Sequence, residues 1–147
     1  MTDELFEVEH TWTTDVGYPA VCVRTGDPYI GIHRCGYVRI PEDHPWYGVH
    51  YNNLEPCPDV HGGITFSEEI SFAEGPPAWW IGFDCAHLGD AREPWPEVTT
   101  LAAHRPISRL LDNGVVRNLY YVMQECEKLA IQVAEHGHNA RKGADDD

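Results

Sequence analysis

Two short segments carry most of the side chains that could do chemistry. Residues 60–66 read VHGGITF, and residues 79–90 read WWIGFDCAHLGD. Each is apolar and aromatic, as strands are, yet each also carries ionisable groups beside glycines. Reactive side chains at strand ends, next to adaptable backbone, are a common way to build a site. We therefore expect a functional site here, with His61, Asp84 and His87 as catalytic candidates.

The second segment combines an acid, a thiol and an imidazole. An aspartate beside a histidine can act as an acid–base pair, because the carboxylate fixes the imidazole tautomer and supports its charged form. In an extended chain Cys85 and His87 face one side and Asp84 faces the other. A turn at Gly89 would bring Asp90 to the strand exit. Cys85 follows an apolar run, which favours an inert core thiol over a nucleophile.

Glycines and aromatics suggest how a ligand would be held. Gly62 and Gly63 would let the backbone approach a ligand closely, and their N–H groups could hold an anion. The alternative is a bulge beside a surface histidine. The HPWYG loop at residues 44–48 could stack a planar ligand such as a base, or pack as a lid over the sheet. The ligand-binding candidates are His33, His44, Trp46, Tyr47, Gly62, Gly63 and Asp90.

Two arrangements would suit a divalent metal such as zinc. His61, Asp84 and His87 could hold an ion with an open position for water, which suits hydrolysis. Alternatively, the H-x-C pattern at residues 33–35 and the C-x-H pattern at residues 85–87 could together surround zinc. The one-residue spacing is unlike a zinc knuckle, and the chain has no CxxC pair. The sequence therefore makes no cofactor certain.

Composition excludes several function classes. The net charge of −14 argues against direct binding to nucleic acid or anionic membranes, which use basic patches. No P-loop, dinucleotide fingerprint, nucleophile elbow or HExxH motif is present. No apolar run is long enough to span a membrane, and the acidic start is unlike a signal peptide. With five cysteines, an odd number, we expect free thiols in a reducing cytoplasm.

Hydrophobic periodicity predicts an α+β fold. Alternating residues predict strands at 6–12, 19–24 and 29–40, and the two segments above predict two more. Apolar residues at three- and four-residue steps predict a helix over 116–134, with Asn113 as its cap and Gly137 as its stop. We expect an antiparallel sheet of about five strands with this C-terminal helix packed on one face.

The same patterns divide the chain simply. Residues 1–137 are expected to form a single domain, within which residues 92–113, rich in proline and other breakers, are an insertion with a short helix near 107–111. Residues 138–147 are small and charged, which is typical of a flexible acidic tail.

The ordered motifs resemble a group of small proteins encoded by tailed bacteriophages. The resemblance rests on HRCGYV at 33–38, HPWYG at 44–48, VHGGITF at 60–66 and WWIGFDCAHLGD at 79–90, and it covers about residues 17–90 plus the final helix. It implies a phage gene product that acts in the cytoplasm of the bacterial host, on the host rather than in the virion. It implies no catalytic role for any residue.

Three functions fit these observations. The first is capture of a small polar, nucleotide-like ligand near the HGG and DCAH segments, such as a host defence signal. The second is a small hydrolase that uses His61, Asp84 and His87, with or without metal. The third is an acidic inhibitor of a basic host protein, because a charge of −14 would suit such a partner. A homo-oligomer is compatible with all three.

Overall fold

A five-stranded antiparallel sheet lies at the centre of the molecule. The computed structural model describes residues 5–72, 75–86, 90–93 and 115–145, with side chains of the last helix described as far as residue 137. The strand order is β1-β2-β3-β5-β4, and each neighbouring pair is antiparallel. The strands are β1 (Leu5–Thr13), β2 (Pro19–Asp27), β3 (Gly31–Ile40), β4 (Phe66–Ile70) and β5 (Ala78–Asp84).

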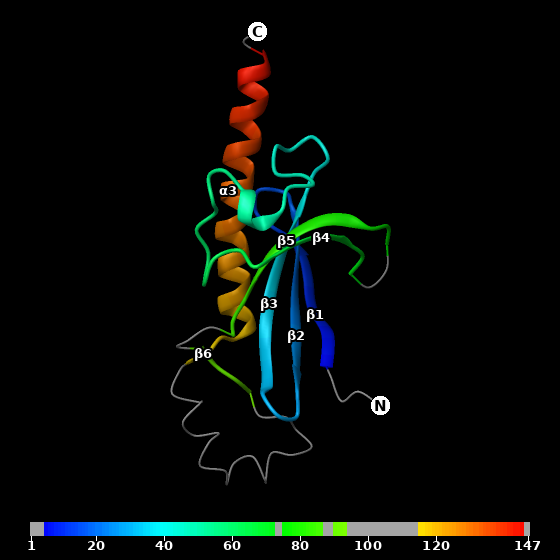
Figure 1. Ribbon diagram of the computed structural model, residues 1–147, viewed down its shortest axis with the longest axis vertical. Coiled ribbons are helices and arrows are strands. Elements are labelled where there is room, and N and C mark those ends of the chain that lie inside the picture. Colours follow the sequence, from blue (N-terminus) through cyan, green and yellow to red (C-terminus); the bar gives the residue numbers. More distant parts are fainter. Residues whose placement is uncertain (1–4, 73–74, 87–89, 94–114, 146–147) are drawn as a thin grey trace.

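One long helix, α3 (Leu119–Asp145), covers one face of this sheet. Figure 1 shows α3 running alongside β3, with its C-terminal end extending beyond the sheet. The helix contacts β3, the central strand of the sheet, and its neighbour β2. The predicted α+β class, with about five antiparallel strands and a C-terminal helix on one face, is therefore confirmed.

Short elements hold the N-terminal end of α3 against the sheet. β6 (Asp90–Ala91) pairs in parallel with β7 (Val115–Val116), which directly precedes the helix. Backbone hydrogen bonds of 2.8 and 2.7 Å join Ile32 of β3 to Glu93. The segment that follows β5 is thereby fixed beside the first residues of β3. The remaining short element is a 3₁₀ turn, η1 (Tyr51–Asn53).

The two faces of the sheet have separate apolar cores, because side chains alternate along each strand. Ala20, Cys22, Val38, Ile81 and Phe83 pack against α3, where Val122, Cys126, Leu129, Ala130 and Val133 meet them. Val21, Val23, Cys35, Tyr37 and Trp80 form the core of the opposite face with Phe72 and Ala78. A side chain's strand parity therefore decides whether it can reach the helix.

The VHGGITF segment differs from its prediction. Residues 60–65 form a turn and irregular chain, and the strand begins only at Phe66. The N–H of Gly63 donates to the carbonyl of Val60 at 2.9 Å, and Gly62 and Gly63 have φ of 68° and 84°. Two successive left-handed residues end an extended strand and favour glycine at both positions. The segment that does pair with β5 is β4, from Phe66 to Ile70.

The helix also begins and ends later than predicted. Asn118, rather than Asn113, caps it: its side-chain oxygen accepts the Tyr121 N–H at 2.8 Å. The helical backbone continues past Gly137 to Asp145, where we had expected a stop and a tail. Tyr120 was expected on the buried stripe, but it is 70% exposed. The helix in the described chain is not apolar enough to span a membrane.

Gly36 marks the point at which α3 comes closest to the sheet. A Cβ built there would lie 2.5 Å from the ring of Phe83 and 2.7 Å from the Sγ of Cys126. We expect Gly36→Ala to lower the free energy of unfolding by about 1–3 kcal/mol, because overpacking forces neighbours off their rotamers. Urea unfolding measures this, and adding Phe83→Leu should restore part of the loss. Equal stability of wild type and Gly36→Ala would contradict the close packing.

Candidate functional site

His61 lies at the centre of a cluster of polar side chains at the N-terminal end of α3. Its Nε2 lies 2.7 Å from Oδ2 of Asp90, and its Nδ1 lies 2.6 Å from the hydroxyl of Tyr121. The His61 ring and the Tyr121 ring meet edge to face, with centroids 5.3 Å apart. The imidazole, 12% exposed, therefore joins a residue of β6 to a residue of the helix.

The turn at Gly62 and the helix together place this imidazole. The backbone N–H of His61 donates to Oε1 of Glu125 at 2.7 Å. Glu125 follows Tyr121 by four residues, so both project from the same side of α3 toward His61. About two turns further along the helix, Gln132 bonds both the N–H and the carbonyl of Asp59. A Cβ at Gly63 would meet nothing within 4 Å, so no neighbouring atom requires a glycine there. The glycines are needed for the positive φ angles of the turn.

Asp90 is the buried anchor of the cluster. Its side chain is 1% exposed, and its two oxygens have different partners: Oδ2 faces His61, and Oδ1 accepts from Nε of Arg117 at 2.8 Å. A buried carboxylate is costly unless it is paired, and here it lies between a cation and a ring N–H. Asp90 was predicted as a ligand-binding residue. The structure places it beneath the site, where it orients the two side chains above it.

Arg117 lies where β7 ends and α3 begins. Its guanidinium carbon is 4.7 Å from the centre of the Tyr121 ring, a cation–π distance. Asp90 raises the pKa of Arg117 by hydrogen bonding to its guanidinium. Only Nε faces Asp90, and within the described parts of the chain neither Nη nitrogen has a hydrogen-bond partner. With 26% of its side chain exposed, Arg117 can present these donors to solvent.

A second ion cluster lies directly behind Arg117. Arg34 binds Glu9 through two hydrogen bonds of 2.8 and 3.0 Å and pairs with Glu93. It also donates to the backbone carbonyl of Arg117 at 3.2 Å. Arg24 extends the cluster, with its Nη2 2.9 Å from Glu93. The start of α3 is thereby tied to β1, β2 and β3.

The structure pairs His61 with Asp90, whereas the sequence analysis grouped His61 with Asp84 and His87 as catalytic candidates. Asp84 accepts hydrogen bonds of 3.1 Å from the Thr65 hydroxyl and from the Ala86 N–H. Its neighbour Phe83 packs toward α3, so Asp84 projects to the other face of the sheet. His87, the third catalytic candidate, lies outside the described residues.

The mirrored H-x-C and C-x-H patterns do not form one zinc site. Cys35 packs in the core of the face without the helix, and Cys85 packs in the core beneath α3. Two thiols on opposite faces of a sheet cannot bind the same ion. Burial raises the pKa of Cys85 to about 12, as expected of an inert thiol. No group of three metal-ligating side chains occurs in the portion of the chain that the structure describes.

His33 lies on β3 with Cys35, on the face away from the helix. Burial lowers its pKa, and the charge of Arg92 lowers it further. Its Nδ1 is buried and has no hydrogen-bond partner among the placed residues. The charges of Asp84 and Asp90 act in the opposite direction, so His33 lies within electrostatic range of the carboxylate that pairs with His61, although it projects from the face of β3 away from the helix.

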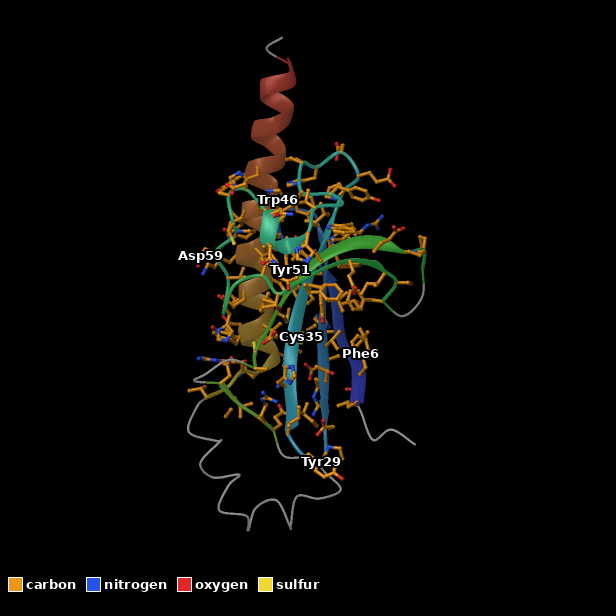
Figure 2. All side chains as sticks on the ribbon, viewed as in Figure 1. Phe6, Tyr29, Cys35, Trp46, Tyr51 and Asp59 are labelled. Carbon is orange, nitrogen blue, oxygen red and sulfur yellow. The ribbon has the colours of Figure 1, made fainter. Side chains whose placement is uncertain are left out.

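The HPWYG loop is part of the core and does not adjoin His61. His44 bonds the carbonyl of Val133 through Nε2 at 2.7 Å and accepts the Trp46 N–H through Nδ1. Trp46 is 2% exposed, so it is closed to a stacking ligand, and Tyr47 packs on Trp79. Val133 is twelve residues beyond Tyr121, about 18 Å along the helix. Figure 2 shows Trp46 beside α3, far from the end near β6.

Sequence reasoning missed Arg117, Tyr121 and Glu125. All three lie within the predicted helix at residues 116–134, and that prediction used the apolar spacing alone. A signal was available: Asn118 followed by helical periodicity is a capping position. Recognising Asn118 as the cap would have placed Arg117 directly before the N-terminus of the helix, where a positive charge is otherwise unfavourable.

An open cavity of about 290 Å³ adjoins the cluster. Arg117 and Tyr121 both line it, with Val115, Val116, Asn118, Tyr120 and Gln124. A larger one, of about 440 Å³, lies further along the outer side of α3. It is lined by Asp59, Gln124, Glu127, Lys128, Ile131 and Gln132, and by no member of the His61 cluster. We therefore place the candidate site at the smaller cavity.

Comparison with known proteins adds no functional assignment. No family model matches the chain, and neither a curated protein nor a solved structure was found to match it. The resemblance to phage proteins therefore stays a prediction. The functional argument rests on the geometry of the His61 cluster and the cavity beside it.

Proposed function

We propose that this protein binds a small anionic, nucleotide-like ligand in the cavity at the N-terminal end of α3. The main support for the proposal is the hydrogen bonding of the Arg117 guanidinium. Its Nε is held by Asp90 from the buried side, its Nη nitrogens have no partner in the described chain, and the residue lines the cavity. Guanidinium groups with free donors bind phosphate and carboxylate well.

The rest of the cavity suits the remainder of a nucleotide. Tyr120 is 70% exposed on the helix surface, and together with other exposed apolar residues on the cavity rim it forms a patch of the kind that binds ligands. Val115 and Val116 add exposed apolar surface on the same rim. A planar base could stack on Tyr120 while Arg117 holds a phosphate. The volume of about 290 Å³ lies near the lower end for small-ligand sites.

The negative net charge of the chain makes a cation at the cavity significant for anion binding. The chain carries 24 acidic and 10 basic residues, so most of its surface repels anions. An anionic ligand therefore needs a local cation, and Arg117 supplies one beside the N-terminus of a long helix. If the chain is a phage product, as the resemblance suggests, the ligand would be a host defence nucleotide in the bacterial cytoplasm.

Adenosine monophosphate and adenosine are the probes that test this proposal. We expect the monophosphate to raise the melting temperature of the protein and adenosine to raise it less, because only the first engages Arg117. Arg117→Gln should weaken monophosphate binding about 10- to 100-fold in calorimetry, the loss typical of a charge-assisted hydrogen bond.

Arg39→Gln is the matched control, because Arg39 is exposed and lies on β3, away from the cavity. It should bind the monophosphate like the wild type. Equal effects of the two probes on the wild type, or full binding by Arg117→Gln, would refute the proposal.

A further inference from the structure

Asp90, His61 and Tyr121 form a line of hydrogen bonds that ends at the cavity. From the buried side outward, Oδ2 of Asp90 lies 2.7 Å from Nε2 of His61, and Nδ1 of His61 lies 2.6 Å from the Tyr121 hydroxyl. The three residues come from β6, the turn after Val60 and the first turn of α3. Exposure rises along the line, from 1% for Asp90 to the partly exposed Tyr121.

For a neutral His61, the chemistry of these groups assigns the positions of the hydrogens. A carboxylate has only acceptor oxygens, so the hydrogen between Asp90 and His61 is on Nε2. In a neutral imidazole the other nitrogen is then an acceptor. Nδ1 of His61 therefore accepts the hydroxyl hydrogen of Tyr121. This is the arrangement in which a carboxylate orients an imidazole, and the imidazole serves as the base for a hydroxyl nucleophile.

Arg117 lies next to Tyr121, the last residue of this line. It lines the same cavity as Tyr121, and its guanidinium lies over the Tyr121 ring. A phosphate bound by its Nη donors would therefore sit next to the Tyr121 side chain. A cation at this position also stabilises the charge that develops on a phosphoryl group and on the phenolic oxygen.

We infer that the protein hydrolyses phosphodiesters, with Tyr121 as the nucleophile, His61 as its base and Asp90 as the residue that positions His61. This inference rests on the proposed function, because Arg117 is the group that would hold the phosphate. It goes beyond it by assigning turnover to the site. Tyr121 and His61 are the catalytic residues, and Asp90 acts through His61.

The reaction has two balanced steps. In the first, the Tyr121 oxygen forms a bond to phosphorus while its proton moves to Nδ1 of His61. The bond from phosphorus to the ester oxygen opposite Tyr121 breaks, and that oxygen leaves and takes a proton from solvent, because in-line displacement places it on the side of phosphorus away from His61. In the second, water attacks phosphorus from that side and loses a proton to solvent. The bond to Tyr121 breaks, its oxygen regains the proton held on Nδ1 of His61, and a phosphomonoester is released.

The surroundings of Tyr121 suit this sequence. Burial, followed by the nearby charge of Glu125, raises the pKa of the Tyr121 hydroxyl, and Arg117 acts in the opposite direction. The hydroxyl thus stays protonated at rest and loses its proton to His61 only as the new bond forms. Glu125 itself is held by the backbone N–H of His61.

Bis(4-nitrophenyl) phosphate is the probe for this inference, and release of 4-nitrophenolate is the readout. We expect turnover by the wild type and a loss of about 10³-fold or more in Tyr121→Phe, since removing the nucleophile disables the whole relay. Rapid acid quenching followed by mass spectrometry of peptides should find a 4-nitrophenyl phosphate adduct on Tyr121. Tyr29→Phe, which changes an exposed tyrosine that does not line the cavity, is the matched control and should turn over like the wild type.

The outcomes separate the inference from the proposed function. Binding of adenosine monophosphate without any release of nitrophenolate would overturn the inference and leave the binding site standing. Turnover by Tyr121→Phe at the wild-type rate, or an adduct on another residue, would also overturn it. Failure of adenosine monophosphate to bind the wild type would refute the proposed function itself, whatever the nitrophenolate assay shows.

Discussion

Replacing Arg34 with methionine is expected to lower the free energy of unfolding by about 3 kcal/mol, the largest stability effect we predict for a single side chain. Arg34 is only 10% exposed, and it holds Glu9 with two hydrogen bonds and pairs with Glu93. Methionine fills much of the same volume but leaves both carboxylates without this cation. Breaking this pair is costly because two partly buried carboxylates remain with Arg24 as their only other cation among the described residues.

The loss should depend on pH. Hydrogen bonding from Arg34 lowers the pKa of Glu9. Burial would raise the pKa of Glu93, but hydrogen bonds from Arg34 and Arg24 outweigh it, so this pKa also lies below its usual value. A carboxyl group with a lowered folded pKa stabilises the fold above its unfolded pKa, which is 4.5 here, and this stabilisation is lost as pH falls through the folded value.

Urea unfolding of both proteins between neutral and acidic pH measures this dependence. The wild type and Arg34→Met should differ most near neutral pH, and their stabilities should converge as the solution becomes acidic. Arg39→Met is the matched control, because Arg39 lies exposed on the same strand and should cost less than about 0.5 kcal/mol. A constant difference at all pH values would show that the carboxylates are not the cause.

The sequence predicts the fold well because its signals are local. Alternation along residues 6–12 and 19–24, and the stripe of Val122, Cys126 and Leu129, each reflect a single element facing a single core. The prediction is wrong where local geometry overrides the apolar pattern. The residues around Gly62 are apolar enough for a strand, yet two positive φ angles end any extended chain there.

The site was predicted only in part, because its contacts are not local. His61 and Asp90 were both singled out, but His61 was grouped with Asp84 and His87 as a catalytic candidate, and Asp90 was placed among the ligand-binding residues. Its actual partners lie 29 residues away, at Asp90, and 60 residues away, at Tyr121. Which of two aspartates reaches a given histidine depends on the face to which each projects. That follows from the position of the helix, which local periodicity does not specify.

The Asp90→Asn variant is expected to change the tautomer of His61. An asparagine has one acceptor oxygen where the carboxylate has two, and two donors, Nε of Arg117 and Nε2 of His61, now compete for it. Arginine cannot give up its proton, so the oxygen should turn toward Arg117. The amide N–H₂ group then faces His61 and requires its Nε2 to accept. The imidazole proton must move to Nδ1, where it points at Tyr121.

This change removes the base that the phosphodiester reaction needs. With a hydrogen on Nδ1, His61 donates to the Tyr121 oxygen and can no longer take its proton. Turnover of bis(4-nitrophenyl) phosphate should fall by about 10⁴-fold, the scale seen when a relay holds its imidazole in the wrong tautomer. Adenosine monophosphate should still bind, because the Nη donors of Arg117 are unchanged.

The tautomer can be measured without any substrate, from the ring nitrogen shifts of His61 in ¹⁵N-labelled protein. We expect the proton on Nε2 in the wild type and on Nδ1 in Asp90→Asn. Asp84→Asn is the matched control: it makes the same chemical change in the acid that the sequence favoured, and it should leave His61 unaltered. A proton on Nδ1 in the wild type, or a tautomer that responds to Asp84 rather than Asp90, would rule out the relay. Because these shifts report the folded protein at rest, the test stands whatever the natural ligand is.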